Sequence, residues 1–111
     1  MKTAIYPGTF DPITYGHIDV IKKSLKIFDR VVVGTTDKKN KSYYFSIEER
    51  LSIIKSSLFK DLKLDKNRIK VIAFDSLTIT LCKKYSASII IRGLRAVSDF
   101  EYEFQLAGMN K

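Results

Sequence analysis

Four short apolar runs, each rich in β-branched residues, recur along this 111-residue chain, and a helical pattern follows each of them. The runs cover residues 4–6, 31–33, 71–73 and 89–91. A continuous apolar run of this length is typical of a strand buried on both faces of a sheet. Strands that alternate with helices favour a parallel sheet with right-handed crossovers and helices on both faces. The pattern therefore predicts an α/β fold built on a doubly wound parallel sheet.

Between the runs, apolar residues recur at spacings of three and four, as they do on one face of an α-helix. The stripes are Ile18, Ile21, Leu25 and Phe28; Ile47, Leu51, Ile54 and Leu58; Leu77, Leu81 and Tyr85; and Phe100, Phe104, Ala107 and Met109. Two helix starts carry a capping box, Ser46 with Glu49 and Ser98 with Glu101. We therefore expect a single domain over residues 1–111 in which strand and helix alternate four times.

The composition fits one globular domain, with 45% hydrophobic and 29% charged residues. No apolar run approaches the roughly 20 residues of a membrane span, and the first residues lack the apolar stretch of a signal peptide. Cys82 is the only cysteine, so it forms no intrachain disulfide, and its helical pattern favours a buried packing residue. These features predict a cytoplasmic protein with no membrane partner.

The net charge of +8 and the pI of about 9.6 attract phosphates of any kind, including those of nucleic acids. Most of the basic residues are lysines scattered along the chain, with no arginine-rich stripe. Solvated surface and an anionic small-molecule substrate are equally good explanations of this charge. We expect no specific nucleic-acid partner.

The segment from Tyr6 to His17 joins the first strand to the first helix and holds both prolines of the chain and two of its five glycines. Proline fixes φ and glycine allows unusual conformations, so the loop should be tightly shaped, with Gly8 and Gly16 leaving room for a ligand. A helix N-terminus after such a loop binds phosphate readily. Thr9 offers a hydroxyl and His17, in the first helical turn, a ring nitrogen. The alternative is a structural turn, and neither a Walker loop nor a G-x-G-x-x-G motif is present.

The segment from Arg92 to Glu103 follows the fourth apolar run. Burying Arg92 at the carboxyl end of a strand is costly unless an anion pairs with it, and its planar fork suits a phosphate. Gly93 allows close backbone approach. The alternative is a structural ion pair with Asp99 or Glu103.

These two segments resemble bacterial phosphopantetheine adenylyltransferases. The resemblance rests on residues 6–12 and 14–17, where Thr14 replaces the first histidine of an H-x-G-H signature, and on residues 92–95 and 100–107. It implies a Rossmann-like nucleotidyltransferase fold with strand order 3-2-1-4. The family continues with a fifth strand, an Ile-Ser-Ser motif and a terminal helix, so we expect a domain that lacks its C-terminal part, with the fifth strand missing.

The resemblance also implies roles for individual residues. His17, Thr9 and Lys41 would be catalytic, and the run from Phe45 to Arg50 supports the placement of Lys41. The residues implied for ATP are Thr9, Phe10, His17, Gly93, Leu94, Arg95 and Glu103. Those implied for the second substrate are Thr9, Lys41, Thr78 and Arg92.

The implied reaction joins the AMP part of ATP to 4′-phosphopantetheine, giving dephospho-coenzyme A and pyrophosphate. Mg²⁺ would neutralise the triphosphate, and Asp11 would either touch that ion or form the turn before Pro12. The family forms homohexamers. Two alternatives remain open: a nucleotidyltransferase that acts on another phosphate acceptor, and a non-catalytic nucleotide-binding module.

Overall fold

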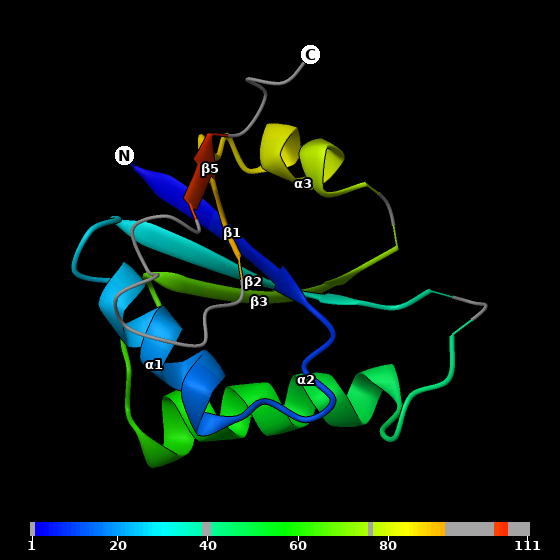
Figure 1. The fold of residues 1–111 in the computed structure, drawn as a ribbon. Helices are drawn as coiled ribbons and strands as arrows, with labels where there is room; N and C mark the ends of the chain where they lie inside the picture. Colours follow the sequence, from blue (N-terminus) through cyan, green and yellow to red (C-terminus); the bar gives the residue numbers. More distant parts are fainter. Residues whose placement is uncertain (1, 39–40, 76, 93–103, 107–111) are drawn as a thin grey trace.

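The computed structural model describes residues 2–38, 41–75, 77–92 and, for their backbone, 104–106. Strands and helices alternate through most of this range (Figure 1), as the sequence predicts. The elements are β1 (Thr3–Gly8), α1 (Tyr15–Ser24), β2 (Arg30–Thr36), α2 (Ile47–Lys55), the π-helical turn η1 (Ser56–Asp61), β3 (Ile69–Phe74), α3 (Thr78–Lys84), β4 (Ile89–Ile91) and β5 (Phe104–Leu106).

The sheet has the order β3-β2-β1-β4-β5, and its first four strands are parallel. The predicted order 3-2-1-4 is therefore confirmed. In the centre, Ile5 of β1 is in register with Val32 of β2 on one side and with Ile90 of β4 on the other. Strand order reverses between β1 and β4, and ligands of such sheets bind beyond the carboxyl ends of the strands at that point. The loops after β1 and β4 both begin there.

The expectation of a helix through Phe104 is wrong for residues 104–106. These residues form β5, which pairs antiparallel with β4, with Ile90 opposite Gln105. The described sheet is therefore mixed and has a strand beyond β4, where the sequence analysis expected none. A stripe of four apolar residues cannot distinguish a helix from a strand when an unpaired sheet edge is near. The predicted cap at Ser98 lies outside the described residues.

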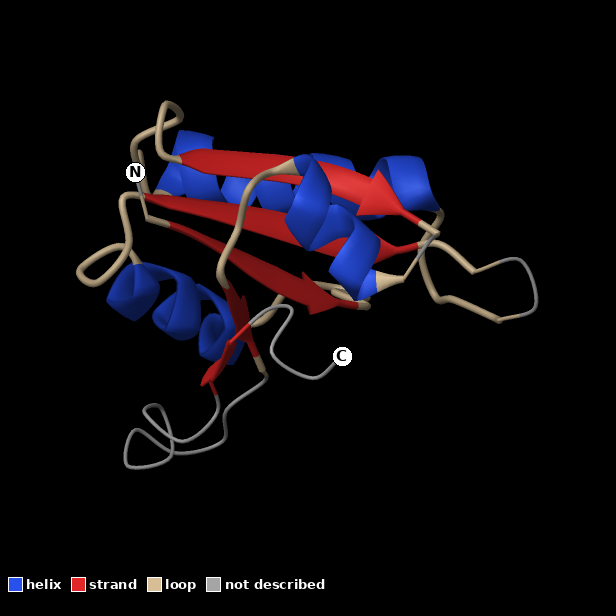
Figure 2. Ribbon diagram, turned by 90° about the horizontal axis from the view of Figure 1, so that it is seen from above, coloured by secondary structure: helices blue, strands red, loops and turns tan. Residues whose placement is uncertain are grey.

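Helices cover both faces of the sheet (Figures 1 and 2). Helices α1 and α2 pack on one face, where Ala4 and Tyr6 of β1 point, and α3 packs on the other, where Ile5 points. Cys82 of α3 is buried in the smaller core, as predicted, and this burial raises the pKa of its thiol. No helix in the described ranges is long and apolar enough to cross a membrane.

Helix α2 begins at the predicted capping box. The Ser46 hydroxyl accepts from the Glu49 N–H at 3.1 Å, and the Glu49 carboxylate accepts from the Ser46 N–H at 2.9 Å. The helix continues directly into η1, so that Ile54 and Leu58 are both buried against the sheet. Arg50, one turn before Ile54, is buried on the same face.

Candidate active site at the carboxyl ends of the strands

The loop between β1 and α1 is held in a strained conformation at Phe10. This residue has a φ of 47°, in the left-handed region that residues with a side chain rarely adopt. The residue is only 2% exposed, and its ring packs edge-on against the rings of Tyr6 and His17, with centroids 5.2 Å and 4.8 Å away. Such strain persists only where the surrounding packing enforces it, and it is concentrated at ligand sites. Phe10 is thus a buried residue whose ring fixes the conformation of this loop.

Gly8 is required by this packing. A Cβ at Gly8 would lie 3.0 Å and 3.1 Å from two atoms of the Phe10 ring, which is tighter than normal contact. A Cβ at Gly16 would meet only the Thr14 hydroxyl at 3.6 Å, an ordinary distance. The missing side chain of Gly8 therefore makes room for Phe10, and the expectation that both glycines also leave room for a ligand stays a prediction.

His17 is fixed by the start of α1. Thr14 is the N-cap, and its hydroxyl accepts from the His17 N–H at 3.3 Å while its own N–H donates to Nδ1 of the imidazole at 2.9 Å. An Nδ1 that accepts carries no proton, so the proton of the neutral ring lies on Nε2. Burial lowers the pKa of His17, which also favours the neutral ring. The predicted position of His17 in the first helical turn is confirmed.

The positive end of α1 has no acidic side chain of its own. The first turn of α2 contains Glu48 and Glu49, whereas that of α1 contains no acidic residue. Carboxylates in the first turn offset the helix dipole, so their absence leaves this end of α1 suited to an external anion.

The Asp11 carboxylate joins the loop after β1 to the segment before α2. One of its carboxylate oxygens accepts from the Tyr44 N–H at 2.5 Å and the other from the Phe45 N–H at 2.8 Å. This geometry favours the structural role of Asp11 over contact with a metal ion. The described residues contain no group of three or more His, Cys, Asp or Glu that could hold a metal.

Lys41 lies in the segment between β2 and α2. Its side chain is exposed, and its N–H donates to the Lys38 carbonyl at 3.2 Å. The Lys38 N–H in turn donates to the Tyr43 hydroxyl at 2.9 Å. Because Gly8 at the end of β1 is in register with Thr35 near the end of β2, Thr9 and this segment begin at the same edge of the sheet.

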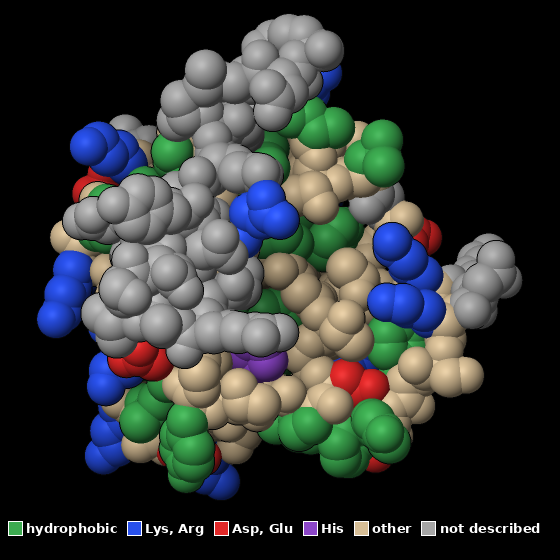
Figure 3. All heavy atoms as spheres, in the orientation of Figure 1, with side chains coloured by type: hydrophobic (Ala, Val, Ile, Leu, Met, Phe, Trp, Pro, Cys, Tyr) green, Lys and Arg blue, Asp and Glu red, His purple; other side chains and the backbone are tan. Residues whose placement is uncertain are grey.

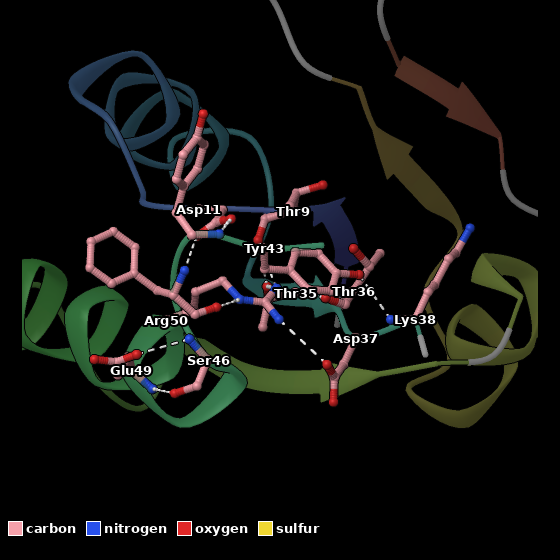
Figure 4. Close-up of polar contacts among 12 residues, drawn as sticks. Thr9, Asp11, Thr35, Thr36, Asp37, Lys38, Tyr43, Ser46, Glu49 and Arg50 are labelled. Carbon is pink, nitrogen blue, oxygen red and sulfur yellow. Dashed lines mark hydrogen bonds and ion pairs between the residues drawn. The ribbon is translucent and has the colours of Figure 1, made fainter. Parts of the chain in front are cut away.

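Arg50 is the site residue that the sequence analysis missed. It is 0% exposed, yet its guanidinium donates to groups at the ends of β1 and β2 (Figure 4). The signal was present, because Arg50 precedes Ile54 and Leu58 by four and eight residues and so falls on the buried stripe of α2. The neutral acceptors are the Thr9 carbonyl at 3.1 Å, the Thr35 hydroxyl at 3.0 Å, the Thr36 carbonyl at 2.7 Å and the Phe45 carbonyl at 3.1 Å.

Two other predicted residues are placed by the structure. Arg92 directly follows β4, beside β1, but its side chain is exposed, so the argument that its burial demands an anion is wrong. Thr78 is half-buried at the first position of α3. Gly93, Leu94, Arg95, Asp99 and Glu103 lie outside the described residues.

In Figure 3 the described part of this face shows backbone and uncharged polar atoms, with hydrophobic atoms beside them and Lys and Arg side chains above and to the right. Hollows of about 940 Å³ and about 710 Å³ lie over the outer face of α2 and between α1 and η1. Neither is lined by Thr9, His17 or Lys41, so size alone does not mark the candidate site.

Known proteins resemble this chain over nearly its whole length. The model of the cytidylyltransferase-like family matches residues 5–111. The chain is 66% identical over 110 residues to the phosphopantetheine adenylyltransferase of Pelagibacter ubique, covering 99% of this chain and 67% of that protein. It is 48% identical over 111 residues to that of Rhizorhabdus wittichii, covering 100% of this chain and 64% of that protein. The chain thus spans about two thirds of the length of these curated relatives.

Solved structures support the fold. Two of them are a bifunctional NMN adenylyltransferase/ADP ribose pyrophosphatase from Francisella tularensis, one complexed with AMP and a Mn ion. They match with TM-scores of 0.65 and 0.67, at 19% and 17% identity, over 82% and 91% of this chain and 31% and 33% of theirs. At this identity the likeness shows the fold alone. The family match and the identity to the curated relatives show that the chain belongs to the cytidylyltransferase-like family and, within it, to the phosphopantetheine adenylyltransferases.

Proposed function

We propose that this chain carries the site for adenylyl transfer from ATP to 4′-phosphopantetheine, which yields dephospho-coenzyme A and pyrophosphate. The observation that carries the proposal is the start of α1, where a neutral His17 locked by Thr14 stands at a helix end without carboxylates. The names of the curated relatives support this choice of substrates.

The reaction needs no general base. A phosphate oxygen of 4′-phosphopantetheine attacks the α-phosphorus of ATP and forms a new P–O bond, while the bond to the β-phosphate oxygen breaks and pyrophosphate leaves with the electron pair. The attacking phosphate is already ionised near neutral pH. Catalysis then consists of holding two anions in line and stabilising the charge that develops on the α-phosphate.

Different side chains in the described residues stabilise the α-phosphate and bind the acceptor. Nε2–H of His17 and the N-terminus of α1 stabilise the α-phosphate. The Thr9 hydroxyl has no hydrogen-bond partner within the ranges that the structure describes, and its side chain points away from Arg50 (Figure 4), so it can donate to a phosphate oxygen. The exposed ammonium of Lys41 and guanidinium of Arg92 bind the phosphate of the acceptor. Thr78 contacts its pantetheine arm.

Mg²⁺ enters this proposal only as the counter-ion of the triphosphate. Mg²⁺ usually keeps several waters and binds through substrate phosphates with one or two carboxylates. Asp11 uses both of its oxygens to accept backbone N–H groups. None of the steps above depends on an ion held by the protein.

Assembly and location are further parts of the proposal. The family resemblance supports a homohexamer in the cytoplasm. Analytical ultracentrifugation of the protein at its natural length tests the assembly, and a monomer at micromolar concentration would contradict it.

The acceptor is tested with a panel. The protein at its natural length is incubated with ATP and, separately, 4′-phosphopantetheine, nicotinate mononucleotide or glycerol 3-phosphate, and pyrophosphate release is measured. We expect release only with 4′-phosphopantetheine. Release with another acceptor would support a different nucleotidyltransferase, and salt-dependent DNA binding without preference for ATP would support a non-catalytic module.

A further inference from the structure

Arg50 is a buried cation that touches several segments at once. Taking a guanidinium out of water is costly unless its donors are used, and here all three nitrogens have partners. Nε and Nη1 donate to neutral oxygens, and Nη2 lies 3.5 Å from the carboxylate of Asp37. The Tyr43 ring covers the guanidinium, with 3.9 Å from Cζ to the ring centroid.

These partners belong to the segments that carry the proposed substrate contacts. The Thr9 carbonyl accepts from Arg50 at 3.1 Å and from the Thr35 hydroxyl at 2.8 Å, which fixes the backbone beneath the Thr9 hydroxyl. On the other side, Arg50 holds the Phe45 carbonyl at 3.1 Å and stacks on Tyr43, two residues after Lys41. Figure 4 shows Arg50 between these groups.

This arrangement is not a simple stabilising ion pair. Among the described residues the only carboxylate partner is Asp37, which lies at the long distance of 3.5 Å and has a side chain that is 46% exposed, so the pair contributes little. A buried charge held mostly by carbonyls is weak evidence for stability, because an apolar residue of similar volume often stabilises a fold equally well. Since Arg50 is fully buried, it cannot touch a substrate itself.

We propose that Arg50 is a positioning residue that holds Thr9 and residues 41–45 in one arrangement, so that Thr9 and Lys41 contact substrate phosphates together. This inference rests on the proposed function for the identity of those contacts. The loop from Gly8 to Asp11 and the segment before α2 are joined a second time through Asp11. Within the part of the chain that the structure describes, Arg50 is the one side chain that hydrogen-bonds to both of them and to the end of β2.

A double-mutant cycle on the protein at its natural length tests the inference. Lys41→Ala should lower kcat/KM for 4′-phosphopantetheine roughly tenfold or more in the unmodified protein, as expected for a lost charge-assisted bond. In the Arg50→Met background the same change should cost less than about threefold, because the segment is no longer held in place. Arg50→Lys should resemble Arg50→Met, since it keeps the charge but not the fork.

Hydrogen exchange gives a readout that does not depend on activity. In Arg50→Met, the Tyr44 and Phe45 amides should exchange about tenfold faster or more, while amides in the centre of β2 keep their rates. Arg68→Met is the matched control. Arg68 also donates to backbone carbonyls, those of Leu25, Phe28 and Asp29, but it lies just before β3, at the opposite end of the sheet. Arg68→Met should change neither the effect of Lys41→Ala on kcat/KM nor the exchange rates of the Tyr44 and Phe45 amides.

The results of these experiments distinguish a failure of the role of Arg50 from a failure of the proposed function. Equal Lys41→Ala factors in both backgrounds, with unchanged Tyr44 and Phe45 exchange, would overturn the role of Arg50. If the unmodified protein transfers to no acceptor but the local exchange effect is seen, the proposed function fails and the positioning of the segment stands. If Arg50→Met does not fold, Thr35→Val removes one support of the Thr9 carbonyl and should show the same non-additivity in smaller degree.

Discussion

The backbone N–H of Thr14 donates a 2.9 Å hydrogen bond to Nδ1 of His17, and this bond serves two purposes at once. It closes the capping box that begins α1, with His17 in the place that glutamate occupies at Glu49 of α2. It also fixes the ring proton on Nε2, because a nitrogen that accepts a hydrogen bond carries no proton. A protonated imidazole could not accept this bond. The start of α1 therefore selects the neutral donor form of its histidine.

Replacing His17 by alanine should lower turnover about 100- to 1000-fold, as for one lost donor at a developing negative charge. The affinity for ATP should change little, because the donor acts mainly in the transition state. Steady-state kinetics with calorimetric ATP binding measures both. Near-normal turnover would exclude the role given to His17.

The variant His17→Gln distinguishes the helix-capping role of His17 from its catalytic role. A glutamine at the third helical position reaches back to the N-cap N–H in the same way as glutamate. We therefore expect His17→Gln to unfold at a higher denaturant concentration than His17→Ala, while its turnover stays far below that of the unmodified protein. Full recovery of turnover in His17→Gln would mean that the imidazole acts only as a cap.

The free energy of unfolding should fall as the pH drops below about 6.5. Burial lowers the pKa of His17 from its ordinary value of 6.5, so between the folded and unfolded pKa values the unfolded chain binds more protons. The contribution is fully present above 6.5 and is lost as the pH falls towards the folded pKa, with a slope of at most about 1.4 kcal/mol per pH unit. Urea unfolding between pH 7.5 and 5.5 measures it.

His17 is the only histidine of the chain, so a variant without it is a direct control for the change in the free energy of unfolding over this pH range. His17→Gln should flatten the profile between pH 7.5 and 5.5. An unchanged slope in that variant, or a free energy of unfolding that rises as the pH falls, would contradict a neutral, half-buried His17 ring.

Gly8→Ala should destabilise the fold by about 1–3 kcal/mol, as expected for overpacking. Its Cβ would lie 3.0 Å from a ring atom of Phe10, which is 2% exposed and cannot move aside freely. Thermal unfolding of Gly8→Ala alone and combined with Phe10→Leu measures the effect. The double variant should lose less than the sum of the two single changes, and strict additivity would show that the ring and Gly8 do not constrain each other.

Asp11→Asn should lower kcat/KM for ATP several-fold at every Mg²⁺ concentration. An asparagine offers one oxygen where the carboxylate uses two, so the bond to either Tyr44 or Phe45 is lost, at about 1–3 kcal/mol. Kinetics over a Mg²⁺ series gives the result, with Asp19→Asn, an exposed ion-pair partner of Lys23, as control. Recovery of kcat/KM for ATP in Asp11→Asn at high Mg²⁺ would identify Asp11 as a metal ligand instead.

The architecture could be predicted because its signals are local. Runs of β-branched residues such as residues 31–33 predict buried strands, and the spacing from Ser46 to Glu49 predicts where α2 begins. Both patterns depend on residues that lie close together in the sequence. The strand at residues 104–106 could not be predicted in this way, because the partner that makes it a strand is β4.

The inner construction of the site could not be predicted for the same reason. Phe10 takes a positive φ because Tyr6, Gly8 and His17 surround its ring, and no local pattern shows such a contact. The periodicity of α2 does place Arg50 among buried residues. Its partners, however, lie 14 and 41 residues away at Thr36 and Thr9, and only the folded chain brings them together.

In the proposed reaction the phosphate of 4′-phosphopantetheine attacks the α-phosphorus of ATP at this site. The most direct measurement uses 4′-phosphopantetheine whose non-bridging phosphate oxygens are ¹⁸O, with products followed by ³¹P NMR. We expect the adenylyl phosphorus of dephospho-coenzyme A to show one ¹⁸O in the bridge and pyrophosphate to show none. A product without ¹⁸O at the adenylyl phosphorus, or ¹⁸O in pyrophosphate, would contradict the account.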